Sequence, residues 1–187
     1  MARDRLLDAA EACFERSGIS KTTVEDIAKQ ASVSRATVYR YFAGRDAVVS
    51  GVILRATERY LERVRGRVEA QPDLGSAILE FVEVTVRAAH RDETIALLFT
   101  SDDSLNSVGI IQGTSVALFE MVAEFLRPLF VAHSDEHKPG LPIDDATEWI
   151  LRCILSLLTV GGPKRRSREG LDTYLRRFLL PPIIAES

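Results

Sequence analysis

Apolar residues recur three and four positions apart along almost the whole of this 187-residue chain. This spacing places them on one face of an α-helix. Runs in which apolar and polar residues alternate, closed by Asn-Gly or Asp-Gly turns, are nearly absent, so little of the chain suits a β-strand. The sequence therefore predicts an all-α protein.

The periodicity divides the chain into a short N-terminal unit and a longer helical body. We expect helices over residues 3–17, 24–31, 35–42, 46–69, 73–89, 94–100, 105–130, 144–160 and 168–180. Gly18 follows the first helix, and a Gly-Gly-Pro run at 161–163 separates the last two. We expect a three-helix domain over residues 1–45 and a larger all-α domain over residues 46–187.

Composition places the chain among ordinary globular proteins. It is 46% hydrophobic and 27% charged. The N-terminus lacks the basic segment and short apolar stretch of a signal peptide. The strongest apolar runs, such as 154–160, fall far short of the roughly 18–20 residues of a membrane span. We therefore expect a cytoplasmic protein without a membrane partner, in which Cys13 and Cys153 are buried thiols.

The segment between residues 23 and 42 predicts two short helices joined by a tight turn at 32–34. Either Thr22 or Thr23 can cap the first helix, because each has an acidic residue three positions later. Ser34 can cap the second helix, whose Val38 and Phe42 lie four apart and would face inward. Two such helices packed on a preceding one form a helix-turn-helix, which places its second helix in the major groove of DNA.

The charge distribution supports this interpretation. The net charge of −3 argues mildly against a general nucleic-acid binder. Residues 29–45, however, contain Lys29, Arg35, Arg40 and Arg45 and no acidic residue. A site-specific DNA binder needs a few well-placed cations and not a basic surface throughout.

The run TVEDIAKQASVSRATVYRYF at residues 23–42, followed by RDAVV at 45–49, resembles the tetracycline-repressor (TetR) family. The resemblance is specific over residues 3–50 and rests beyond them on length and helical character. Two positions depart from the family pattern. Ser32 replaces a turn glycine, so its backbone either avoids a positive φ or adopts one at some cost. Arg45 replaces a lysine that commonly contacts a phosphate, and it keeps the charge.

Carried over by position, the resemblance implies two sets of DNA contacts. The base-facing set is Arg35, Ala36, Tyr39 and Arg40. The phosphate-facing set is Thr23, Ser34, Thr37, Tyr41 and Arg45, with Arg3 and Arg5 as a weaker candidate arm. Arginine reads guanine edges through its bidentate fork, whereas tyrosine and threonine hydroxyls suit phosphates.

The resemblance also implies a homodimer that encloses a small effector in its C-terminal domain. A two-fold dimer predicts a palindromic operator on double-stranded DNA. The candidate interface residues are Ile150, Cys153, Ile154, Leu157, Leu171, Tyr174, Leu175 and Phe178. The candidate pocket residues are Phe81, Thr85, Leu98, Phe99, Ile110, Phe119, Met121 and Trp149, which favour an apolar effector. The alternative for both sets is that these residues serve only the core of their own subunit.

We interpret the chain as a ligand-released repressor, with an activator of the same family or a helical interaction protein without DNA binding as alternatives. We do not expect an enzyme or a cofactor, because the sequence lacks a Gly-rich phosphate loop, a nucleophile elbow and a zinc-protease motif. His133 and His137 lie four apart and could hold a metal, but their polar loop offers no further strong ligand. We therefore expect no metal site.

Overall fold

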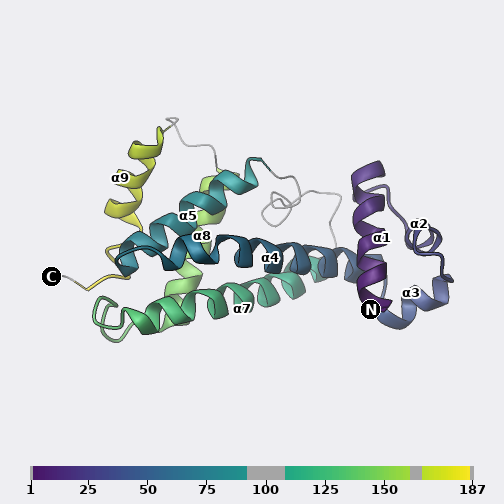
Figure 1. Ribbon diagram of the computed structural model, residues 1–187, viewed down its shortest axis with the longest axis horizontal. Coiled ribbons are helices and arrows are strands. Elements are labelled where there is room, and N and C mark those ends of the chain that lie inside the picture. Colours follow the sequence, from purple (N-terminus) through teal and green to yellow (C-terminus); the bar gives the residue numbers. More distant parts are fainter. Residues whose placement is uncertain (1, 92–107, 161–165, 186–187) are drawn as a thin grey trace. The chain divides into compact units, whose positions relative to one another are not determined.

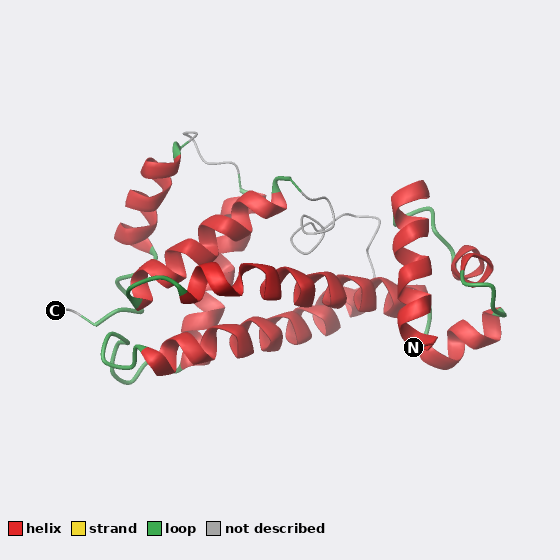
Figure 2. Cartoon of the chain, viewed as in Figure 1, coloured by secondary structure: helices red, strands yellow, loops and turns green. Residues whose placement is uncertain are grey.

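The computed structural model describes residues 2–91, 108–160 and 166–185, with the backbone alone for residues 108–115 and 159. The described residues form helices and loops, and their one bridge of strand type pairs His137 with Ile184 (Figure 2). The all-α prediction is confirmed. None of the described helices combines the length and apolar character that a bilayer crossing requires.

The helices are labelled as in Figure 1: α1 (Ala2–Ser17), α2 (Val24–Gln30), α3 (Arg35–Tyr41), α4 (Arg45–Glu69), α5 (Leu74–Ala89), α7 (Val108–Ala132), α8 (Ile143–Thr159) and α9 (Arg168–Phe178). Their ends agree with the expected ranges to within three residues, as is normal for helix termini. The helix expected over 94–100 lies outside the described residues. The expected domain boundary, between residues 45 and 46, falls at the start of α4 and stays a prediction.

The chain forms two compact units, which divide within α4 between Ala56 and Thr57 and within α7 between Val116 and Ala117. In the first unit α1 packs on α2, and α2 packs on α3. Its core contains the apolar stripes expected from the sequence, including Leu7, Ile27 and Val38, all fully buried. Burying these side chains provides the main stabilisation of such short helices, which are marginal alone.

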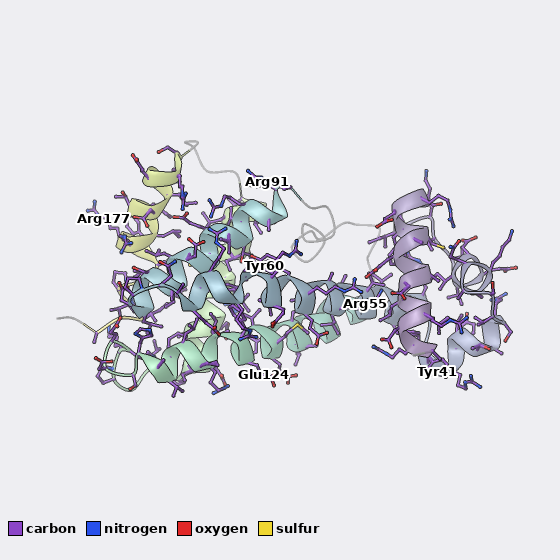
Figure 3. The ribbon with its side chains drawn as sticks, viewed as in Figure 1. Tyr41, Arg55, Tyr60, Arg91, Glu124 and Arg177 are labelled. Atoms are coloured by element: carbon purple, nitrogen blue, oxygen red, sulfur yellow. The ribbon has the colours of Figure 1, made fainter. Side chains whose placement is uncertain are left out.

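Gly51 lets α4 approach α1 and α3 closely in this unit. A Cβ added at Gly51 would lie 3.0 Å from Leu7 Cδ2 and 3.1 Å from Phe42 Cε1. On the same side, Arg55 of α4 bonds to Asp8 at 2.7 Å and lies 2.9 Å from Glu11, both on α1 (Figure 3). The start of α4 is therefore a structural part of the N-terminal unit.

The second unit is built around α5, which packs against α8 and α9 (Figure 1). Its core also takes residues from α4 and α7. Two polar side chains of α5 are buried in it: Glu83 accepts a bond from Arg168 at 3.2 Å, and Thr85 pairs with Tyr60. Buried polar groups of this kind are tolerated because they are hydrogen-bonded.

Candidate nucleic-acid interface

Thr23 begins α2 as its cap. Its hydroxyl accepts a hydrogen bond from the Asp26 amide at 3.2 Å and donates one to the Asp26 carboxylate at 2.6 Å. The Thr23 amide also donates to that carboxylate, which completes a capping box. These hydrogen bonds from Thr23 lower the pKa of the Asp26 carboxyl below its usual range. Thr22, the other candidate cap, is buried and donates its hydroxyl to the Gly18 carbonyl at 2.9 Å.

Ser32 holds the turn between α2 and α3 in the left-handed conformation, with φ of 54°. The Ser32 amide bonds to the Lys29 carbonyl, and the Val33 amide bonds to the Ala28 carbonyl at 2.9 Å. This pair of bonds is the Schellman motif, which satisfies the last carbonyls of α2. The sequence left open whether Ser32 avoids or adopts a positive φ, and the chain adopts it. A side chain at such a position is strained relative to glycine.

Ser34 caps α3 and orients it. Its hydroxyl accepts the Thr37 amide at 3.2 Å and lies 3.0 Å from the Thr37 hydroxyl. Val38 is fully buried and Phe42 nearly so, as predicted. The helix therefore has a fixed inner face, and its polar residues lie on the other side.

The outer face of α3 carries the predicted base-facing residues, and all four are exposed: Arg35, Ala36, Tyr39 and Arg40. Tyr39 is 49% exposed and Tyr41 is 38% exposed. Tyr41 lies at the end of the helix (Figure 3). The Arg40 guanidinium stacks over the Tyr41 ring at 5.1 Å. An exposed α3 face rich in arginine and tyrosine suits hydrogen bonding to base edges and phosphates.

Two of the predicted cations have partners within the protein. Arg35 lies 3.6 Å from Glu25 in a pair whose side chains are both more than half exposed. Such an exposed pair is weak and opens at little cost. Arg45, by contrast, is mostly covered and bonds to backbone carbonyls of the turn between α1 and α2.

The two candidate arm residues on α1 contact the same unit. Arg3 lies over the Phe42 ring at 5.1 Å, and the guanidinium of Arg5 is 3.5 Å from the Ala31 carbonyl. Their predicted role beside the DNA backbone stays a prediction.

Five of the predicted pocket residues have described side chains, and they lie on three helices of the second unit. Phe81 and Thr85 are buried on α5, Phe119 and Met121 are half-buried on α7, and Trp149 is 39% exposed on α8. The Trp149 indole N–H donates to the Leu179 carbonyl at 3.1 Å. Leu98 and Phe99 lie outside the described residues, as does the side chain of Ile110. The pocket stays a prediction.

A buried hydroxyl pair, which the sequence reasoning missed, lies in this core. Thr85 donates to the Phe81 carbonyl at 2.7 Å, so the Tyr60 hydroxyl donates to Thr85, at 2.8 Å. Burial raises the pKa of Tyr60 to about 12. Helical periodicity predicts that Tyr60 faces inward but cannot reveal its partner 25 positions away.

The predicted interface residues divide into three groups by exposure. Ile150, Ile154 and Leu175 are fully buried in the core of their own unit; Cys153, Leu157 and Leu171 are half-buried; Tyr174 and Phe178 are exposed. Tyr174 and Phe178 lie one turn apart on α9 with ring centroids 4.8 Å apart. Burial raises the pKa of the Cys153 thiol.

The two loop histidines have structural contacts. His133 Nδ1 lies 3.0 Å from Glu136, whose carboxylate also accepts the Leu74 amide at 2.8 Å at the start of α5. His137 packs edge-on against the Phe130 ring. Among the described residues, no three His, Cys, Asp or Glu side chains gather as a metal site would require.

Comparison with known proteins connects this geometry to a family. The sequence profile of bacterial regulatory proteins of the tetR family matches residues 6–52. An uncharacterised HTH-type transcriptional regulator of Mycobacterium tuberculosis is 27% identical over 189 residues, which cover 100% of this chain and 88% of the relative. The HTH-type regulator UidR of Escherichia coli is 24% identical over 126 residues, covering 67% of this chain and 64% of that one.

Solved structures share the fold over the whole chain. The TetR family repressor AlkX from Dietzia sp. aligns with a TM-score of 0.65 at 22% identity, covering 99% of both chains. A TetR family protein from Vibrio parahaemolyticus aligns with a TM-score of 0.63 at 18% identity, covering 100% of both chains. The helix-turn-helix built by α2 and α3 and the larger helical unit are both features of this fold.

Proposed function

The chain belongs to the tetR family of bacterial regulatory proteins, and from this premise we propose that it is a repressor that binds a palindromic operator as a homodimer. That it is a DNA-binding transcriptional regulator follows from the family itself. The observation that carries the proposal is the division of α3 into two faces. Val38 is buried, whereas its neighbours Tyr39 and Arg40 are exposed.

In this proposal the outer face of α3 reads the major groove. Arg40 and Arg35 donate to guanine edges, and Tyr39 and Ala36 contact neighbouring bases. Arg35 exchanges its exposed partner Glu25 for DNA. The exchange costs little because both side chains already lie in water.

In this proposal the DNA phosphates are bound by residues at the two ends of α3 and at the start of α2. Ser34 and Thr37 lie at the start of α3, with their hydroxyls 3.0 Å apart, and Tyr41 lies at its end. Thr23 lies at the start of α2, and its hydroxyl proton must leave the Asp26 carboxylate to reach a phosphate. Hydroxyls suit this task because they donate to phosphate oxygens at fixed positions and so set the register of the protein on the duplex.

The homodimer is proposed to form through α8 and α9. Phe178 is 55% exposed and Tyr174 is 36% exposed, so this aromatic pair of α9 stays partly exposed in the single chain, although Arg177 and Arg166 stack over the two rings. Trp149 of α8 is also partly exposed. Burial of large aromatic side chains is a main source of interface stability. Ile150, Ile154 and Leu175 would support this surface from the core beneath it.

The proposed effector is a small apolar or amphipathic molecule bound in the second unit, where Phe81 and Met121 contribute to an apolar interior. Two proteins with this fold have been solved with such molecules. FadR from Bacillus subtilis is in complex with stearoyl-CoA (TM-score 0.58, 20% identity), and SmeT is in complex with triclosan (TM-score 0.60, 20% identity). An effector releases DNA only if it binds the released state more tightly than the DNA-bound state.

Selection of bound duplexes from a library of randomised sequences tests the proposal. We expect the chain to enrich one sequence with two-fold symmetry, and to bind it with affinity that falls steeply as salt rises. Recovery of a non-symmetric site would contradict the dimer. Failure to enrich any sequence would instead favour a helical interaction protein.

Whether the protein represses or activates transcription needs a separate measurement in the source organism. Deletion of the gene should raise transcription beside the enriched site if the protein is a repressor. A fall in transcription after deletion would identify an activator.

A further inference from the structure

The guanidinium of Arg45, the first residue of α4, points at the turn between α1 and α2. Nε donates a hydrogen bond to the Thr22 carbonyl at 2.8 Å, and Nη2 donates one to the Ile19 carbonyl. The remaining nitrogen, Nη1, lies 3.4 Å from the carboxylate of Asp46. The side chain is 26% exposed, so most of it is already committed to groups of the protein itself.

The same turn is tied to α1 from its other side. The Thr22 hydroxyl donates to the Gly18 carbonyl at 2.9 Å, with the Cys13 carbonyl at 3.3 Å. The next residue along the chain, Thr23, is the cap of α2. Arg45 therefore holds the backbone immediately before the first helix of the helix-turn-helix.

We infer that Arg45 is a positioning residue, which fixes α2 and α3 for DNA binding by clamping this turn to the start of α4, and is not itself a phosphate anchor. The inference rests on the proposed function. The planar fork of arginine can bond two carbonyls in fixed directions at once, whereas the ammonium of lysine is a single point of charge. The arginine at this position therefore provides a clamp that a lysine would not.

Salt dependence separates a positioning role from a phosphate contact. Each phosphate neutralised by a cation contributes about 0.9 to the slope of log affinity against log salt. Removing a phosphate contact therefore reduces this slope. Removing a positioning residue lowers affinity without changing the slope, because the number of phosphates contacted stays the same.

The test uses Arg45→Gln, Arg45→Lys and the full chain, with the duplex enriched by the unaltered protein as the probe. Arg63→Gln is the matched control, since Arg63 is an exposed arginine of the same helix in the other unit. We expect both Arg45 variants to bind roughly tenfold more weakly at fixed salt, the effect of losing about one hydrogen bond to a charged group. We expect their slopes to match that of the unaltered chain, and Arg63→Gln to bind as the unaltered chain does.

Three results would overturn the inference: a slope lowered by about 0.9 or more in Arg45→Gln, full affinity in Arg45→Lys, or full affinity in Arg45→Gln. The first two would identify a phosphate contact. The third would leave Arg45 with a role in stability alone. Arg45→Lys keeps the charge, so it remains informative if Arg45→Gln does not fold.

Amide hydrogen exchange provides a readout that needs no DNA. In Arg45→Gln and Arg45→Lys, the amides of residues 18–23 should exchange faster while those in the middle of α1 keep their protection. Unchanged exchange at 18–23 would show that Arg45 does not hold the turn. If the unaltered chain enriches no duplex, the proposed function fails, and the exchange result still reports separately on the clamp.

Discussion

Glu25 at the start of α2 and Arg35 at the start of α3 face each other, with a carboxylate oxygen 3.6 Å from a guanidinium nitrogen. Arg35 must leave this partner to reach DNA, and Glu25 then remains as a negative charge close to the phosphates. We expect Glu25→Gln to raise DNA affinity roughly two- to fivefold, the range of an exposed ion pair. A gel-shift titration at low salt measures the change.

Glu15→Gln is the matched control for this prediction, because Glu15 is an exposed acid on α1 and the net charge changes equally. We expect Glu15→Gln to have the smaller effect. Equal gains in both variants would show that the total charge, and not the pair with Arg35, limits binding.

Substituting alanine for Gly51 and for Gly66, both in α4, should have opposite effects on the free energy of unfolding. A Cβ at Gly51 would lie 3.0 Å from Leu7 and 3.1 Å from Phe42, whereas a Cβ at Gly66 has no neighbour within 4 Å. We expect Gly51→Ala to lower the free energy of unfolding by about 1 kcal/mol through overpacking. We expect Gly66→Ala to raise it by about 0.5–1 kcal/mol through helix propensity. Urea denaturation measures both, and a gain in Gly51→Ala would contradict the close approach.

Replacing Ser32 by glycine should stabilise the turn of the helix-turn-helix. The Ser32 φ of 54° is unfavourable for a side chain and free for glycine. We expect Ser32→Gly to raise the free energy of unfolding by roughly 0.5–1 kcal/mol, because the relief of strain outweighs the greater freedom of glycine in the unfolded chain. Ser32→Val should lower it. Thermal unfolding of both variants checks the order, and a reversed order would place Ser32 outside the left-handed region.

The raised pKa of Tyr60 predicts that the folded chain loses stability at high pH. Burial raises the Tyr60 pKa to about 12 in the folded chain, so the folded state keeps a proton that the unfolded state releases from about pH 10. Its contribution to stability is present below pH 10 and is lost as the pH rises toward 12. Tyr60→Phe should cost about 0.5–1.5 kcal/mol at neutral pH for the lost hydrogen bond to Thr85. It should also flatten the fall in stability between pH 10 and 12, and an equally steep fall in urea denaturation would contradict the assignment.

The local features of the N-terminal unit could be predicted from the sequence because they depend on residues a few positions apart. The capping of α3 by Ser34 and the burial of Val38 and Phe42 are confirmed on these grounds. The bonds of Arg45 could not be predicted in this way, since its acceptors lie 23 and 26 positions earlier and the contact depends on how helices pack.

In the second unit, the sequence predicts which helix faces are apolar but not which of them are buried. Ile154 and Phe178 both belong to apolar stripes, yet Ile154 is fully buried and Phe178 is 55% exposed. Periodicity finds the apolar face of a helix but not whether its own unit covers that face. The sequence therefore could not separate core residues from interface candidates on α8 and α9.

The most direct test of the account is the operator affinity of Arg40→Ala, measured by gel shift at fixed salt on the duplex that the unaltered chain enriches. Arg40 is exposed on the outer face of α3, so its loss should leave folding unchanged and weaken binding by about 1–3 kcal/mol. Arg63→Ala, on α4, should bind as the unaltered chain does. Unchanged affinity in Arg40→Ala would contradict the assignment of α3 as the helix that reads DNA.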